Sequence, residues 1–121
     1  AIGAMDLAED FFAKSLVIDL DDNPMDSRDG IHAASLGGVW NCLIFGFAGI
    51  HYEQDVLYMN PHLPRKWKSM EFTLMIAGRK LRVCVTPEEA LLQGMDGQTR
   101  GIRVAAGGKE YLLEGELKIR F

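Results

Sequence analysis

The residues that most suggest chemistry lie in one short run, residues 29–38, with the sequence Asp-Gly-Ile-His-Ala-Ala-Ser-Leu-Gly-Gly. It places one histidine and one serine among glycine and alanine, directly before a long apolar segment. The first N–H groups of a helix have no intrahelical partner, and the helix dipole adds about half a positive charge at that end. If a helix begins near Ala33 or Ser35, this run therefore provides a site at which an anion such as phosphate can bind.

The side chains of the run suit such an anion site. Gly30 lets a ligand approach the backbone, His32 can donate to a phosphate oxygen, and Ser35 can donate its hydroxyl. The same residues also have a purely structural interpretation, because Ser35 is a good N-cap residue and a histidine in a loop is often only solvated. Both interpretations stay open from the residue types and their spacing.

Two predicted helices flank this run. Residues 5–20 carry apolar side chains three and four positions apart, which predicts an amphipathic helix that ends before Pro24. Residues 33–49 have almost no polar face, so we expect this second helix to be buried on nearly all sides. Glycine destabilises a helix interior by about 1 kcal/mol relative to alanine. The glycines of this segment therefore predict close packing against its backbone; they are Gly37, Gly38, Gly46 and Gly49.

From His51 onward the apolar residues alternate with polar ones, which is typical of strands. Residues 50–52 and 56–59 flank residues 53–55 as a predicted hairpin. Further strands are predicted at residues 69–77, 81–86, 90–93, 101–105, 110–113 and 117–121. Short strands separated by glycine turns indicate an antiparallel β-sandwich or jelly roll. The predicted fold class is thus mainly β with two N-terminal helices, and the apolar second helix indicates a part of a larger protein.

Length, charge and cysteine content narrow the class of protein. A chain of 121 residues is long enough to bury a core without disulfides. Its net charge of −4 argues against nucleic acid or an anionic membrane surface as a partner. The longest apolar run, residues 39–50, is too short to span a bilayer, so we expect a cytoplasmic protein. Cys42 and Cys84 lie in apolar runs without metal-ligand spacing, so we expect free thiols, no metal and no cofactor.

Several unusual sequence words occur in one order along the first two thirds of the chain. They are Asp-Gly-Ile-His-Ala-Ala-Ser-Leu-Gly-Gly-Val-Trp at 29–40, Phe-Gly-Phe-Ala-Gly at 45–49, Asn-Pro-His-Leu-Pro at 60–64, and Trp67. Together they resemble family 65 of the glycoside hydrolases, the maltose, trehalose, kojibiose and nigerose phosphorylases. The resemblance extends from about Ala8 to Thr86 and beyond that point rests on strand rhythm only.

The resemblance implies a fold and a reaction. Such enzymes have an N-terminal β-sandwich, an (α/α)₆ barrel that holds the active site, and a C-terminal β domain. Residues 1–49 then correspond to the end of the barrel, and residues 50–121 to the C-terminal β-sandwich. The family cleaves an α-glucosidic disaccharide with phosphate and inverts the anomeric centre, which gives β-glucose 1-phosphate and glucose. Inorganic phosphate and a disaccharide are therefore the expected partners.

The resemblance also assigns the site residues. The run at 29–38 matches the phosphate-binding loop of the family, which implies phosphate contacts from Gly30, His32 and Ser35 and from the backbone of Leu36 and Gly37. The general-acid glutamate of the family lies upstream of this segment. Glu9, Glu53 and Glu71 match no catalytic motif. We therefore expect no catalytic residue within this chain and no activity from the chain alone.

Two other functions stay open. The β domain could bind carbohydrate or another protein, with Trp67, Tyr52 and Tyr58 as stacking platforms, although aromatic residues on hairpin strands more often pack across the strands. The parent could also be a hydrolase of the same family, such as a trehalase, in which water replaces phosphate. The apolar second helix further favours self-association of the chain, for example as a homodimer.

Overall fold

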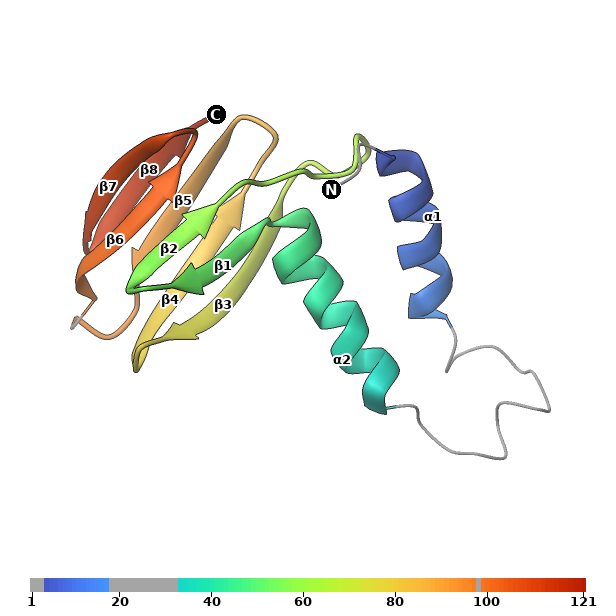
Figure 1. Cartoon of the computed structure of the whole chain (residues 1–121), viewed down its shortest axis with the longest axis horizontal. Helices are drawn as coiled ribbons and strands as arrows, with labels where there is room; N and C mark the ends of the chain where they lie inside the picture. The colour runs from blue at the N-terminus through green and yellow to red at the C-terminus, as the bar shows by residue number, and fades with distance from the viewer. Residues whose placement is uncertain (1–3, 18–32, 98) are drawn as a thin grey trace.

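A computed structural model describes residues 4–17, 33–97 and 99–121 (Figure 1). Two helical segments lie side by side next to a sandwich of two four-stranded sheets. This arrangement confirms the predicted fold class, mainly β with two helices that precede a sandwich. Among the residues described, no helix is long and apolar enough to cross a membrane.

Helix α1 (Met5–Leu16) is shorter than the predicted segment 5–20. Its last turn is tight, because the N–H of Val17 donates to the carbonyl oxygen of Lys14 at 3.3 Å. The hydroxyl of Ser15 also donates to the carbonyl oxygen of Phe12 at 2.7 Å. A hydroxyl that occupies a helical carbonyl competes with the backbone bonds, which accounts for the early end. Residues 18–20 lie outside the described part of the chain.

Helix α2 (Ala33–Asn41) begins at a position that the sequence predicted, and it continues into a π-helical segment, η1 (Cys42–Phe47). The wider turn is closed by the N–H of Ala48, which donates to the carbonyl oxygen of Leu43 at 2.9 Å. Such π-helical turns occur often at functional sites. The helix ends before Gly49, whose φ of +58° suits glycine.

The prediction that this second helix is buried on nearly all sides is wrong for this chain. Ile44 and Phe47 are buried, but Leu36, Trp40 and Phe45 are exposed by 57%, 47% and 60%. Among the described residues, α1 and the start of the sandwich contact this helix, and its exposed apolar side chains lie on faces that these elements do not cover.

The predicted close packing at the glycines of this helix is also wrong at three positions. Apart from the backbone of the helix itself and the adjacent residues, no described atom lies within 4 Å of the place where a Cβ would stand at Gly37, Gly38 or Gly46. At Gly49 the prediction is correct, because the carbonyl oxygen of Asn60 lies 1.9 Å from that place. The contact there is with the segment after β2 rather than with another helix.

The first sheet has the strand order β1-β2-β6-β7. Its strands are β1 (Ile50–Glu53), β2 (Val56–Met59), β6 (Arg100–Ala106) and β7 (Lys109–Glu114). The predicted all-antiparallel pairing is wrong at one place, since β2 and β6 pair in parallel. A parallel pair needs a crossover connection, and here the strands of the second sheet supply it.

The second sheet has the strand order β3-β4-β5-β8 and is antiparallel throughout. Its strands are β3 (Met70–Ile76), β4 (Arg79–Val85), β5 (Glu89–Gly94) and β8 (Glu116–Arg120). The predicted alternation of β3 is confirmed, because Met70, Phe72, Leu74 and Ile76 are buried or half-buried while Glu71 and Thr73 are exposed. The core lies between the sheets and includes fully buried side chains from both, such as Leu57, Leu81, Leu92 and Leu113.

The hairpin turns fix the register of the strands. The pairs Gln54-Asp55 and Ala77-Gly78 have positive φ at both residues, as two-residue type I′ hairpins require. Glu53, which the sequence placed in the first turn, instead ends β1 and pairs with Val56. This two-residue turn therefore shifts the hairpin register from the one predicted with residues 53–55 as the loop.

Three aromatic rings join the helices to the sandwich. Phe12 of α1, Phe47 of η1 and Trp67 lie with ring centroids 5.1–5.7 Å apart in edge-on or tilted contacts. The N–H of His62 also donates to the carbonyl oxygen of Phe47 at 2.8 Å, and Lys66 lies 3.6 Å from Glu9. Buried aromatic contacts of this kind add about 0.5–1.5 kcal/mol per pair beyond their area. They hold both helices against one end of the sandwich.

Candidate functional site

The amino end of α2 is the part of the structure closest to the predicted phosphate loop. The helix starts at Ala33, and its first turn contains no acidic residue that would neutralise the positive end of the dipole. Leu36 is exposed, and the backbone at Gly37 is open on its outer side. The first N–H groups of a helix have no partner within the helix, so this turn has the general character of an anion site.

The other predicted site residues are placed only in part. Gly30 and His32 lie outside the described residues, as does the side chain of Ser35, although its backbone belongs to the first turn of α2. The assignment of phosphate contacts to Gly30, His32, Ser35, Leu36 and Gly37 thus stays a prediction. At about 1.5 Å per helical residue, the start of α2 lies roughly 20 Å from the end of η1, at the end of the helix remote from the sandwich (Figure 1).

Three glutamates match no catalytic motif in the sequence, and in the structure they form surface ion pairs or are exposed. Glu71 accepts from Nε and Nη2 of Arg82 at 2.9 and 2.7 Å, and Glu9 forms the ion pair with Lys66. Glu53 is exposed at the end of β1. Within the described residues no group of three or more His, Cys, Asp or Glu could hold a metal ion. Both cysteines are free; Cys42 is exposed and Cys84 half-buried.

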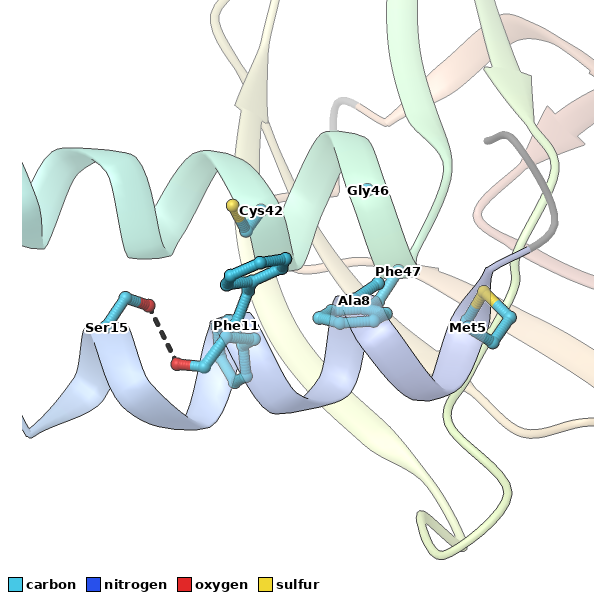
Figure 2. A pocket seen from close by; sticks show the side chains of 8 residues that line it. Met5, Ala8, Phe11, Ser15, Cys42, Gly46 and Phe47 are labelled. Atoms are coloured by element: carbon cyan, nitrogen blue, oxygen red, sulfur yellow. Dashed lines mark hydrogen bonds between the residues drawn. The ribbon is translucent and has the colours of Figure 1, made fainter.

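A largely apolar cleft of about 400 Å³ lies between α1 and η1 (Figure 2). Phe11 and Phe12 line it from α1, and Cys42, Gly46 and Phe47 line it from the other helix. The hydroxyl of Ser15 is a polar group at this cleft, and it is already bonded to the carbonyl oxygen of Phe12. The cleft therefore offers packing surface rather than acid–base chemistry.

The three aromatic residues considered as sugar platforms have different surroundings. Trp67 is half-buried and contacts Phe12 and Phe47, so its ring serves the junction between helices and sandwich. Tyr52 is 41% exposed, and its hydroxyl donates to Oδ1 of Asp55 at 3.1 Å. Tyr58 stacks on His51 with ring centroids 4.6 Å apart and an interplanar angle of 4°.

The stack of His51 on Tyr58 is a feature that the sequence did not reveal. With residues 53–55 as the predicted loop, these two residues are not opposite each other. A two-residue loop, which the type I′ turn at Gln54-Asp55 requires, pairs them directly.

The environment of Tyr52 raises the pKa of its phenol above the ordinary value of 10.0. Desolvation is the largest cause, followed by the hydrogen bond to the Asp55 carboxylate and the repulsion between the two negative charges. Arg79 and Arg103 oppose the shift. The phenol thus stays protonated at neutral pH.

Two sequence models of known families match the chain. The glycosyl hydrolase family 65 C-terminal domain matches residues 51–113, and the glycosyl hydrolase family 65 central catalytic domain matches residues 1–41. The first match covers most of the sandwich, and the second covers α1 and α2.

Several relatives with similar sequences are described as disaccharide phosphorylases. The chain is 36% identical over 118 residues to an α,α-trehalose phosphorylase of Thermoanaerobacter brockii, which covers 97% of this chain and 15% of that protein. It is 37% identical over 103 residues to a kojibiose phosphorylase of Caldanaerobacter subterraneus subsp. tengcongensis, which covers 84% of this chain and 13% of that protein. The chain thus spans about a seventh of the length of these curated relatives.

A solved structure has the same architecture. Its description reads "Putative kojibiose phosphorylase from human microbiome", and it superposes with a TM-score of 0.85 at 26% identity over 99% of this chain. The matched part is 16% of that protein. The helices and the sandwich therefore occur together in a solved, much larger protein.

Proposed function

The chain belongs to glycosyl hydrolase family 65, and from this premise we propose that it is the C-terminal part of an inverting disaccharide phosphorylase. In this proposal residues 1–49 complete the catalytic barrel and residues 50–121 form the β domain beside it. The parent enzyme takes an α-glucosidic disaccharide and inorganic phosphate and releases β-glucose 1-phosphate and glucose. The similar trehalose and kojibiose phosphorylases support this substrate class.

The observation that carries the proposal is the start of α2 at Ala33, directly after the run Gly30–His32. The N–H groups of the first turn are aligned on whatever anion lies before the helix, and no acidic residue of that turn opposes it. His32 and Ser35 add donors that suit phosphate oxygens. The task of this chain in the reaction is then to hold and orient phosphate.

The chemistry of the remaining steps follows from inversion. A phosphate oxygen attacks the anomeric carbon from the face opposite the glycosidic oxygen, and the bond to that oxygen breaks as the new bond forms. The leaving oxygen takes the bonding electron pair and a proton from a general acid, which releases glucose. Because phosphate is the nucleophile, no second catalytic carboxylate is needed to activate water. The general acid belongs to a part of the enzyme outside these 121 residues, so the chain alone is inactive.

A phosphorolysis assay on the parent enzyme tests the proposal. Trehalose, kojibiose and maltose are incubated with and without phosphate, and β-glucose 1-phosphate and glucose are measured separately. Phosphate-dependent release of β-glucose 1-phosphate is the expected result. Release of glucose alone, independent of phosphate, would instead identify a hydrolase such as a trehalase, which is the main alternative within the family.

Substitutions in the loop locate the phosphate. Ser35→Ala and His32→Ala are expected to raise the KM for phosphate by about tenfold, as the loss of one hydrogen bond to a charged group predicts. Ser69→Ala, at an exposed serine before β3, is the matched control and should leave this KM unchanged. Equal values for Ser35→Ala and Ser69→Ala would remove Ser35 from the site. The isolated chain is expected to form no β-glucose 1-phosphate.

A further inference from the structure

The outer face of the β1-β2-β6-β7 sheet carries a groove that no part of the proposed reaction uses. The space is about 490 Å³, and its lining includes His51, Tyr58, Asn60, Ala105, Gly107 and Glu110. Small-molecule sites in proteins commonly have this size. The residues that line the groove belong to or adjoin β1, β2, β6 and β7, whereas α2 begins at the end of the helix remote from these strands (Figure 1).

The strand register places four of these residues in one row across the sheet. His51 pairs with Tyr58, Tyr58 with Ala105, and Ala105 with Glu110. The row faces outward, because the residues that flank Tyr58 and Ala105 along their strands are buried in the core; these are Leu57, Met59, Val104 and Ala106. An aromatic pair thus lies at one end of the row and a carboxylate at the other.

The alanine in this row leaves one face of the tyrosine ring accessible. The rings of Tyr58 and His51 are nearly parallel, so His51 covers one face of Tyr58. Ala105 is the neighbour of Tyr58 on the other side, and its methyl group is too small to cover the second face. The groove therefore has an aromatic wall, the ring of Tyr58, and His51 supports the face of that ring that points away from Ala105.

The polar groups of the groove are free to bind a ligand. Within the part of the chain that the structure describes, the carboxylate of Glu110 and the ammonium of Lys109 have no hydrogen-bond or ion-pair partner. Asn60 is exposed beside them at the end of β2. Lys109 and Glu110 carry opposite charges, so together they add no net charge to the groove.

We propose that this groove binds a neutral hexopyranose unit of a saccharide. The apolar C–H face of the sugar ring packs on the open face of Tyr58, and its hydroxyls donate to Glu110 and bond to Asn60. A phosphate or nucleotide is disfavoured by the Glu110 carboxylate and by the net charge of −4. A peptide that extends a sheet binds along an edge strand, whereas this groove crosses the face of the sheet. The proposal does not depend on the phosphorylase reaction.

Titration of the 121-residue chain with methyl α-glucoside, trehalose and maltose tests the proposal. Amide chemical shifts are followed by NMR, with Gly107 and Gly108 as reporters in the turn beside the groove. A site of this size on one sugar ring is expected to bind with a Kd in the millimolar range. Shift changes at His51, Tyr58, Gly107 and Gly108 are the expected result. Unchanged shifts with all three sugars at tens of millimolar, or equal changes with inorganic phosphate, would overturn the proposal.

Matched variants make the test independent of folding. Ala105→Phe places a ring against the open face of Tyr58 and is expected to weaken sugar binding by at least about tenfold. Leu112→Phe is the control, since Leu112 is exposed on the same sheet face but outside the groove. Glu110→Gln, which keeps the shape, tests the carboxylate and should weaken binding by a smaller factor. Binding that Ala105→Phe leaves as strong as in Leu112→Phe would show that the sugar lies elsewhere.

Discussion

Gly49→Ala tests whether the contact between the helix end and the β2 exit holds the two parts of the chain together. An alanine Cβ would lie 1.9 Å from the carbonyl oxygen and 2.4 Å from the carbonyl carbon of Asn60, both backbone atoms that cannot rotate away. The residue also has a φ of +58°, which costs about 1–2 kcal/mol for a residue with a side chain.

The expected cost is the sum of strain and displacement. To accept the methyl group, Asn60 must move, which weakens the hydrogen bond from its N–H to the carbonyl oxygen of Gly49 (3.0 Å). Loss of that bond costs about 1 kcal/mol, and overpacking of a tight contact costs about 1–3 kcal/mol. We therefore expect Gly49→Ala to lower the free energy of unfolding by about 3–6 kcal/mol, against a total of about 5–15 kcal/mol for a typical domain.

Gly78→Ala is the matched control for the backbone term. Gly78 has a φ of +75°, but no atom lies within 4 Å of its Cβ position. Its substitution should cost only the conformational term of about 1–2 kcal/mol. Urea unfolding, followed by far-UV circular dichroism and by tryptophan fluorescence, measures both variants. If Gly49→Ala costs no more than Gly78→Ala, the close approach of Asn60 does not stabilise the junction and the reasoning is wrong.

Three further changes test other parts of the structure. Tyr52→Phe removes the exposed hydrogen bond to Asp55, so we expect a small loss of stability at neutral pH. The raised pKa of Tyr52 makes the contribution of this phenol fully present below the unfolded value of 10.0 and lost as pH rises through the folded pKa, so the variant should lose less stability than the parent chain between pH 7 and the alkaline range. Urea midpoints at both pH values measure this, and an equal alkaline loss in both proteins would contradict it. Trp40→Lys with Phe45→Lys should reduce self-association of the 121-residue chain in sedimentation velocity, since both side chains are exposed apolar groups on one helix; an unchanged sedimentation profile would show that this face does not mediate association. Thr99→Val should lower the free energy of unfolding by about 1–3 kcal/mol because the buried hydroxyl donates to Oδ1 of Asp96, and a change within about 0.5 kcal/mol would show that this bond does not matter.

The sandwich was predictable because its strands alternate cleanly. Residues such as Phe72 and Leu74 occupy every second position of β3, and a period of two specifies both the strand and the face that is buried. The pairing partners were less accessible. Nothing local to β2 indicates that it pairs in parallel with β6, because that contact depends on how the second sheet folds between them.

For the helices, the sequence predicted the elements themselves but not their burial. Their existence and the start of α2 at Ala33 follow from apolar spacing and composition, but their burial does not. Trp40 and Phe45 are apolar, yet within this chain they are exposed. An apolar pattern in the sequence predicts that a helix has an apolar face, but it does not predict which residues pack against that face.

The prediction of the phosphate site depended on a short sequence motif rather than on apolar periodicity. A glycine, a histidine and a serine before a helix suggest an anion, and only the resemblance selects phosphate in a disaccharide phosphorylase. No sequence motif of this kind marks the groove at Tyr58. It depends on a register that brings Ala105 beside an aromatic ring from a distant strand, which is a property of the folded sheet.

The parallel pairing of β2 with β6 also sets an order for folding. Val56 pairs with Arg103, so the first sheet cannot be completed until most of the chain has left the ribosome. The β3-β4-β5 meander pairs neighbours in sequence and can form earlier. Until β6 arrives, the β1-β2 hairpin is an isolated two-stranded unit, which is marginally stable at best in water. The hairpin that follows the helices is therefore joined to the rest of its sheet only through β6, a strand that comes much later in the sequence.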